Sequence, residues 1–303
     1  MKGQIPTEGI KRVSIDGFGG DVRILPSEGN ELVYNIGGGL EIQHEIRENS
    51  LFLKIRSKSV LGIPFFNFGG SNGDIELYIP RDRSLDLNLK SGDIFFTDYR
   101  GENISLKAVS GDINIGRLLC NSFQAHLTSG DIDIDMETKK GSLNFKSGDV
   151  RIFLRGEDWS VDISGVSGDV DVDTETNSID LYIKGISGDI SVNNESIGTG
   201  RIGNKHLVTD GGRNRLSINV ISGDVSVKTG KGTGEIKILQ QAQTNRPESQ
   251  ISTSIENDTA ISYIPEEVKK VRDMYRAGKL SKEDAMSLID AMGYGGLNNI
   301  LEE

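Results

Sequence analysis

Aspartate and serine side chains recur at a fixed spacing through the middle of this 303-residue chain. The shared unit is Ser-Gly-Asp followed by Ile or Val, and its first six copies start 18 to 20 residues apart. A column of carboxylates could bind Ca²⁺, and a column of hydroxyls could supply nucleophiles. The seven copies are Ser91-Gly92-Asp93, Ser110-Gly111-Asp112, Ser129-Gly130-Asp131, Ser147-Gly148-Asp149, Ser167-Gly168-Asp169, Ser187-Gly188-Asp189 and Ser222-Gly223-Asp224.

A structural role explains these triplets better than either chemistry. Aspartate in turns accepts hydrogen bonds from nearby backbone N–H groups, so the carboxylates are expected to fix a corner. The nonapeptide spacing of calcium β-rolls is absent, although the sequence leaves Ca²⁺ binding at this column open. No base recurs beside the serines, which are expected to form a hydrogen-bonded ladder inside the corner. We therefore predict a structural corner ladder with no catalytic residue, no metal site and no cofactor.

The remaining residues that could bind a metal or act as nucleophiles are scattered along the sequence. His44, His126 and His206 show no metal-ligand spacing with one another or with Cys120. Because Cys120 is the only cysteine, no intrachain disulfide can form, which fits a reducing cytoplasm.

Apolar and polar residues alternate on both sides of each triplet. Around the first triplet the apolar residues are Leu85, Leu87 and Leu89 before it, and Ile94 and Phe96 after it. Successive side chains of a strand point to opposite faces, so the inward positions change parity across Ser-Gly-Asp. Glycine tolerates the backbone conformation of such a corner. The sequence therefore predicts a mainly β fold, a single-stacked β-solenoid (β-helix) of ~19-residue coils with a short C-terminal α-helical hairpin.

Departures from the repeat divide the chain into four regions. Residues 1–84 are predicted to be an N-terminal β region that caps the solenoid, and 85–239 to be regular coils with an interruption near 193–215. Residues 240–264 are predicted to be a linker or weak cap strands. In 265–303, apolar residues follow helical spacing and Pro and Gly lie at helix ends, which predicts the helical hairpin.

The formal net charge of −11 restricts the class of partner. A general nucleic-acid binder needs a basic face, and electrostatic docking to an anionic membrane needs one too, so both are disfavoured. The sequence has neither a signal-peptide pattern nor an apolar stretch long enough to span a bilayer. A cytoplasmic location without a direct membrane span is expected, and peripheral membrane association stays open.

The predicted hairpin is too small to bury a core of its own, so it is expected to dock on a protein partner or on another copy of the chain. A basic group within the interruption could hold a phosphate or an acidic partner, or could simply be solvated. The candidate partner contacts are Val271, Tyr275, Leu288, Arg201, Arg213 and Arg215.

With these residues in view, the chain resembles the bacterial β-strand-repeat domain of unknown function that carries the family name "putative adhesin". The resemblance rests on the triplet ladder and on Ile79-Pro80 leading into Leu85 and Ser91, and it covers roughly residues 10 to 240. The segment from Val271 to Ala285 is similar to helical modules of the SHOCT type. That second resemblance implies oligomerisation or partner contact.

These observations favour a non-enzymatic β-solenoid scaffold or interaction protein, which acts through protein–protein contacts and has a link to the bacterial cell envelope. One alternative is a β-helix polysaccharide lyase or hydrolase, for which Glu195 and Asp210 are the nearest carboxylates to the irregular loop. A second alternative is a surface adhesin that a membrane partner holds through the hairpin.

Overall fold

The computed structural model describes residues 1–230 except 18, 58, 61–62, 65–73 and 201–202, then strand 236–241, and singly Arg272 and Arg276. The chain divides into two units, Met1–Asn245 and Arg246–Glu303. In the second unit the two described arginines are in helical conformation. The predicted hairpin itself, with Val271, Tyr275 and Leu288, lies outside the described residues.

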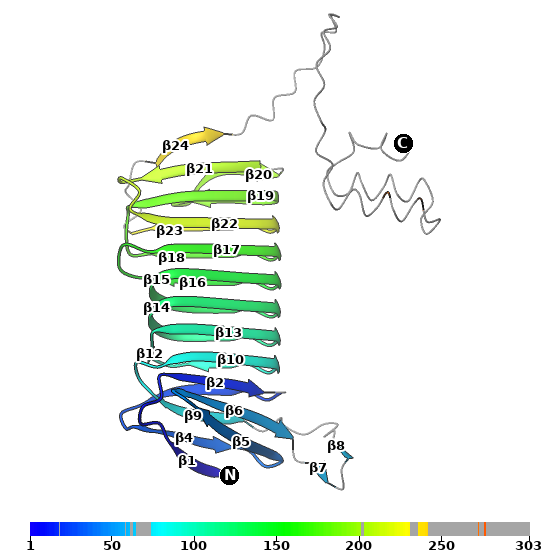
Figure 1. Ribbon diagram of the computed structural model, residues 1–303. Helices are drawn as coiled ribbons and strands as arrows, with labels where there is room; N and C mark the ends of the chain where they lie inside the picture. Colours follow the sequence, from blue (N-terminus) through cyan, green and yellow to red (C-terminus); the bar gives the residue numbers. More distant parts are fainter. Residues whose placement is uncertain are drawn as a thin grey trace, which may run out of the picture. The chain divides into compact units, whose positions relative to one another are not determined.

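The described part of the first unit is built from β-strands, which Figure 1 shows stacked above one another. Twenty-two strands form one hydrogen-bonded sheet, and β7 and β8 form a separate pair. The strands are β1 (Lys2–Pro6), β2 (Arg12–Gly17), β3 (Val22–Ser27), β4 (Glu31–Ile36), β5 (Leu40–Arg47), β6 (Ser50–Ser57), β7 (Ser59–Val60), β8 (Ile63–Pro64), β9 (Ile75–Pro80), β10 (Ser84–Ser91), β11 (Ile94–Phe96), β12 (Tyr99–Arg100), β13 (Asn103–Ser110), β14 (Ile113–Ser129), β15 (Ile132–Ser147), β16 (Val150–Leu154), β17 (Ser160–Ser167), β18 (Val170–Thr174), β19 (Ile179–Val192), β20 (Glu195–Gly200), β21 (Gly203–Thr209), β22 (Asn214–Ser222), β23 (Val225–Thr229) and β24 (Ile236–Gln241).

Two ladders of parallel strands run along the stack. The first ladder contains the strand segments before the corners, in the spatial order β6, β2, β10, β13, β14, β15, β17, β22 and β19. The second ladder contains the segments after the corners, in the order β9, β3, β11, β14, β15, β16, β18, β23 and β19. Strands β14, β15 and β19 belong to both ladders because each continues from one to the other.

The predicted single-stacked β-solenoid with a helical hairpin is wrong. Strands β22 and β23 lie between β17–β18 and β19, although they follow β19 in the sequence. Antiparallel strands lie at both ends of the ladders, with β4 on β9, β5 on β6, and β20 and β21 on β19. The structure is therefore a mainly β, continuous sheet whose strand order departs from the sequence order. A repeated pattern fixes the shape of a coil but not its place in the stack, which is why the periodicity misled.

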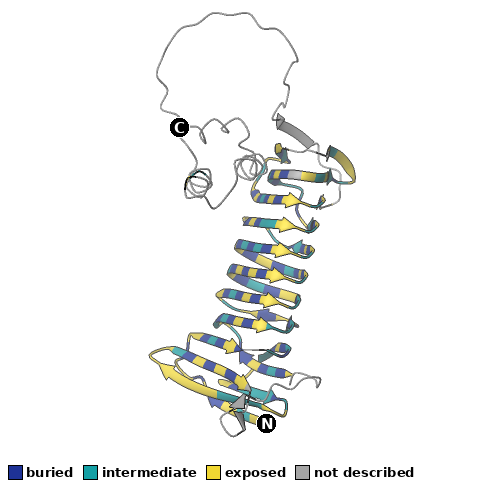
Figure 2. Cartoon of the chain, turned by 90° about the vertical axis from the view of Figure 1, so that its right-hand side faces the viewer, coloured by how far each residue is buried: buried dark blue, intermediate teal, exposed yellow. Residues whose placement is uncertain are grey.

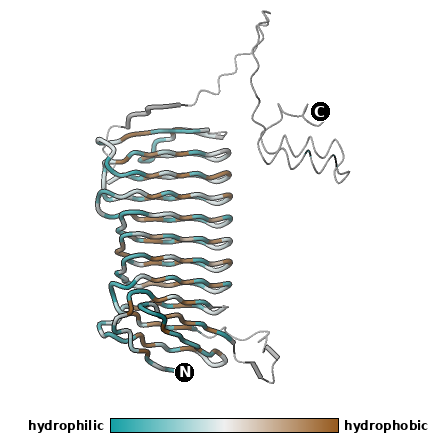
Figure 3. Tube along the Cα trace, in the orientation of Figure 1, coloured by the Kyte–Doolittle hydropathy of each residue, from teal (hydrophilic) through white to brown (hydrophobic). Residues whose placement is uncertain are grey.

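The two ladders enclose an aliphatic core. Leu85, Leu87 and Leu89 are buried in the first ladder, as are Ile94 and Phe96 in the second. The same alternation continues along the stack as buried and exposed bands in Figure 2 and as apolar and polar bands in Figure 3. Burial of each such aliphatic side chain stabilises the fold by about 1.5–3 kcal/mol.

Large and small inward residues compensate one another between neighbouring strands. Phe145 in β15 faces Gly165 in β17. A Cβ atom at position 165 would lie 2.1 Å from Cζ of Phe145, so the ring occupies the space of the absent side chain. Close packing of this kind leaves little room for added volume on either strand.

The N-terminal region extends the ladders as well as ending them. Strand β2 pairs in parallel with β10, and β3 pairs in parallel with β11. Asp21 precedes β3 at a corner that matches the later triplets, although the serine is missing there. The interruption near 193–215 contains β20 and β21, which run antiparallel along β19 before the chain returns to β22.

Candidate functional site: the corner column and the outer groove

The triplet glycines stand where two neighbouring corners are in closest contact. All seven have φ between 107° and 139°, a conformation that favours glycine. At Gly130, a Cβ atom would lie 2.2 Å from the carbonyl oxygen of Gly111 in the adjacent corner. The Gly130 N–H donates to the carbonyl oxygen of Ser147, at 3.2 Å. Both conformation and contact therefore require glycine at this position.

The aspartates form a hydrogen-bonded column along the corners. Each carboxylate before Asp189, the last in the column, accepts the backbone N–H of the next aspartate in the stack, at distances of 2.8–3.0 Å. Hydrogen bonds to an ionised carboxylate are stronger than neutral ones, so each one ties its corner to the next. The spatial order of this corner column is Asp21, Asp93, Asp112, Asp131, Asp149, Asp169, Asp224 and Asp189.

The column thus uses its carboxylates as acceptors for the backbone. Within the part of the chain that the structure describes, no group of three or more His, Cys, Asp or Glu residues is arranged to hold a metal ion. The observed geometry directs Oδ1 of every aspartate before Asp189 toward its neighbouring corner.

The triplet serines lie outside the corner, not inside it as expected. Ser110, Ser129 and Ser147 are exposed, while the residue two positions before each of them is buried. The chain begins to turn before the serine, so two successive side chains point outward. Among the serine hydroxyls, that of Ser110 donates to the carbonyl oxygen of Lys90 at 3.5 Å.

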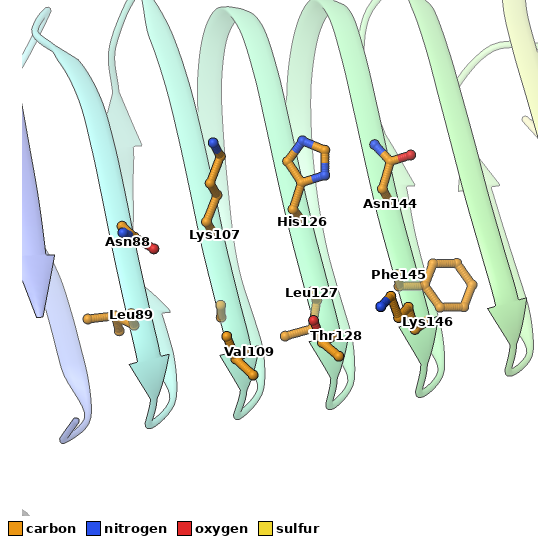
Figure 4. A pocket seen from close by; sticks show the side chains of 11 residues that line it. Asn88, Leu89, Lys107, Val109, His126, Leu127, Thr128, Asn144, Phe145 and Lys146 are labelled. Carbon is orange, nitrogen blue, oxygen red and sulfur yellow. The ribbon is translucent and has the colours of Figure 1, made fainter. Parts of the chain in front are cut away.

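A shallow groove of ≈ 360 Å³ crosses the outer face of the first ladder, and we call it the outer groove. Figure 4 shows its side chains on successive strands. Lys107, His126 and Asn144 form one row, and a second row lies nearer the corners. The complete lining consists of Asn88, Leu89, Lys107, Ala108, Val109, His126, Leu127, Thr128, Asn144, Phe145 and Lys146.

The outer groove carries positive charge that is not neutralised by pairing. Among the described residues, neither Lys107 nor Lys146 is in an ion pair. No lining residue is acidic. At one end, the Asn88 side-chain amide donates to Oδ1 of Asp16 at 3.3 Å, so this amide is partly engaged already.

The outer face of the second ladder differs, because its charges pair across neighbouring strands. Arg155 Nε and Nη2 donate to the two carboxylate oxygens of Asp135 at 2.6 and 2.8 Å, and Nη1 donates to Glu175 at 2.5 Å. The hydrogen bond with Asp135 raises the pKa of Arg155 above its usual range. Lys228 lies 3.9 Å from Asp173 in a further cross-strand pair.

The predicted basic group is only partly brought together. Arg213 pairs with Glu157 at 3.0 Å, and the guanidinium of Arg215 lies 4.9 Å from the ring centroid of Tyr182. The His206 ring stacks on the Tyr182 ring with the ring centroids 4.1 Å apart, and His206 Nε2 lies 2.7 Å from Oδ1 of Asp180. Arg201 lies outside the described residues.

The two carboxylates of the enzyme alternative occupy different kinds of position. Glu195 is exposed at the start of β20. Asp210 is exposed in the turn after β21, with a positive φ of 47°. Neither lines the outer groove.

Cys120 is buried next to the core, and its Sγ donates to Oγ1 of Thr138 at 3.5 Å. Burial raises the pKa of this thiol to about 11. A thiol held in its protonated form is a poor nucleophile at neutral pH. His44 lies on β5, His126 lies on β14 in the first ladder, and His206 lies on β21, which pairs antiparallel with β19.

Sequence reasoning missed the outer groove and the stacked Tyr182. The signal for the groove is present in the sequence as an absence of acidic residues. Three consecutive first-ladder segments, 103–110, 122–129 and 140–147, contain no Asp or Glu in a chain with 45 such residues. The pairing of Tyr182 with His206 depends on the antiparallel return of β21, for which the repeat gives no signal.

Comparison with known proteins identifies a family. The family model described as Toastrack DUF4097 matches residues 10–196. No curated protein matches the chain.

Within the described residues, no helix is long and apolar enough to cross a membrane.

Solved structures of low sequence identity cover most of the chain. A "putative adhesin" from Bacteroides fragilis is 16% identical over 75% of this chain and 96% of its own, with a TM-score of 0.44. A "putative lipid binding protein" from Parabacteroides distasonis is 13% identical over 75% and 96%, with a TM-score of 0.40. A "putative cell adhesion protein" from Clostridium sporogenes is 13% identical over 76% and 99%, with a TM-score of 0.29.

Proposed function

Because the chain belongs to the Toastrack DUF4097 family, we propose that it is a non-enzymatic interaction protein that acts through protein–protein contacts. One observation supports this most directly. The repeated carboxylates serve as acceptors that join one corner to the next. The repeat therefore builds a frame, and its outward surfaces are available for contact.

The C-terminal segment 265–303 is the proposed contact element. Its sequence has two short apolar stripes at helical spacing, one with Val271 and Tyr275 and one with Leu288, and together they are too small to bury a core of their own. The partner is another protein or a second copy of the chain. Arg213 and Arg215, before and on β22, are the proposed accessory contacts, because both side chains are exposed.

The test compares the full chain with a chain that lacks residues 265–303. Light scattering after size-exclusion chromatography measures self-association, and quantitative recovery of crosslinked partners measures binding to other proteins. The deletion is expected to abolish one of the two. An unchanged oligomeric state together with unchanged partner recovery would contradict the proposal.

Point variants sharpen this test without removing the segment. Tyr275→Ala with Leu288→Ala should reproduce the loss seen with the deletion, because each removes an apolar contact. The exposed Arg276 supplies the matched control, and Arg276→Ala should retain the interaction.

Incubation with acidic and neutral polysaccharides, with and without Ca²⁺, tests the enzyme alternative. Release of cleaved products would overturn the non-enzymatic assignment.

The protein is further proposed to act in a reducing compartment. The single cysteine is buried and free, so the fold neither contains nor needs a disulfide within this chain. Cell fractionation tests the compartment. Recovery in an oxidising compartment would contradict this part of the proposal.

A further inference from the structure

We propose that the outer groove binds a linear anionic polysaccharide, which lies along the stack and crosses strands β10, β13, β14 and β15. This inference goes beyond the proposed protein contact and does not depend on it. Three features carry it: the local charge, the spacing of the groups, and the kinds of polar group present. Figure 4 shows the two rows of side chains that flank the proposed path.

The local charge is opposite to the charge of the whole chain. The formal net charge of the protein is −11, yet three neighbouring first-ladder segments contain no acid, and two of the three contain lysine. Lys107 and Lys146 are exposed and lie in the groove, and Lys140 is exposed on the same face. Along the ladder, acidic residues return on the flanking strands at Asp86 and Asp162, and at the corner end the groove is bordered by the aspartates of the corner column. The groove lysines, with no acidic residue in the lining, attract an anion to this face.

The spacing of the groups favours a sugar polymer over a peptide. Equivalent side chains on adjacent strands repeat at about 4.7–4.9 Å. A linear polysaccharide presents its hydroxyl and acid groups once per sugar, at a repeat close to that strand spacing. An extended peptide presents side chains on one side only every second residue, or about 6.7 Å, and soon falls out of step with the rows.

The polar groups match the groups of an acidic sugar. Each lysine ammonium provides a point charge with three donors for a carboxylate or sulfate. Between them, His126 and Asn144 provide donors and acceptors for hydroxyl groups. Thr128 adds a hydroxyl to the second row. The strands that carry these side chains are hydrogen-bonded on both sides, so little ordering is needed when a ligand binds.

The outer face of the second ladder does not offer such a surface. Its best-placed cation, Arg155, is already held by Asp135 and Glu175. An anionic ligand would have to displace two carboxylates there, whereas Lys107 and Lys146 have no described carboxylate to give up. Binding of an anion at Lys107 and Lys146 therefore breaks no described ion pair, whereas binding at Arg155 would break two.

The test uses the full chain and polygalacturonate oligomers as the probe, with binding measured by isothermal titration calorimetry at low salt. The variant Lys107→Gln with Lys146→Gln should bind about tenfold or more weakly, because hydrogen bonds to charged groups contribute this much. The control Lys11→Gln with Lys139→Gln removes the same charge from two exposed lysines outside the groove and should bind as the wild type does. Neutral dextran should not compete.

Several results would overturn this inference. They are an absence of polygalacturonate binding by the wild type, equal losses in the groove and control variants, or tighter binding of polyglutamate or single-stranded DNA than of polygalacturonate. Thermal melts of both double variants establish that the fold is retained. The purified chain alone is used, so failure here leaves the protein-contact proposal standing, and failure of that proposal leaves this one standing.

Discussion

The corner column lies between the ends of successive strands, and the outer groove lies on the outer face of those strands, yet the two neighbouring regions differ in how far their sequence varies along the stack. The corner repeats one triplet with little variation, and its glycine and aspartate contact the equivalent residues of the next corner. The groove has no repeated triplet, and its row changes from Lys107 to His126 to Asn144. Strict repetition here marks a position that the stack constrains on both sides. Variation marks a surface that only solvent or a ligand constrains.

The physical basis of this difference is the number of contacts that each side chain must satisfy. At a corner, glycine and aspartate are held by the backbone of two neighbouring coils at once. In the groove, the side chains extend away from the sheet and leave the backbone pairing unchanged. Substitutions in the two regions should therefore differ in kind, with loss of stability at the corner and loss of binding in the groove.

The largest effect is expected for Gly130→Ala. Its φ of 132° strains an alanine, and the new Cβ would meet the Gly111 carbonyl oxygen at 2.2 Å. Strain and overpacking together are expected to lower the free energy of unfolding by about 2–5 kcal/mol. The control is Gly9→Ala, where φ is 75° but no heavy atom lies within 4 Å of the added carbon. Chemical denaturation should show a loss of only about 1 kcal/mol for the control.

Cys120 provides an independent measurement of the same variant. Its thiol is buried with a pKa of about 11, so a thiol reagent at pH 8 should react slowly with the wild-type protein. Reaction should accelerate in Gly130→Ala because opening of the stack exposes the thiol. Equal melting and equal labelling of Gly130→Ala and Gly9→Ala would show that close contact of the corners is unimportant.

The sequence predicted local structure well and stacking poorly. The alternation around each triplet identified the inward residues, such as Leu87 and Ile94, because burial in a strand follows a period of two. It did not predict that β22 stacks on β17, because every corner offers the same N–H and C=O groups to any other coil. The prediction that the triplet serines lie inside the corner was also wrong, since the chain turns before Ser129 and leaves its side chain exposed.

The candidate surface was the least predictable feature. Lys107, His126 and Asn144 are far from one another in sequence and become one row only when β13, β14 and β15 pair in register. Polar residues at outward positions are ordinary in strands, so their types gave no warning. The absence of Asp and Glu from segments 103–110, 122–129 and 140–147 indicates a common surface only once the structure shows that these segments lie side by side.

A smaller effect is expected at the aspartate column. Asp131→Ala removes the acceptor for the Asp149 N–H, at 2.8 Å, and should cost about 1 kcal/mol at this exposed site. Asp131→Asn keeps a side-chain oxygen and removes a charge from a column of like charges, so it should cost less than half as much. Denaturation of both variants at low salt measures the difference. An asparagine variant that is as unstable as the alanine variant would indicate that charge, rather than the acceptor, holds the corner.

The smallest effect on stability is expected for Lys107→Gln with Lys146→Gln. Both ammonium groups are exposed and lack described carboxylate partners, so their removal should change the free energy of unfolding by no more than about 0.5 kcal/mol. Equilibrium denaturation of the double variant beside the wild type measures this. A stable protein that has lost polygalacturonate binding would separate the two regions cleanly. A loss as large as that of Asp131→Ala would instead place the groove lysines among the residues that hold the sheet together.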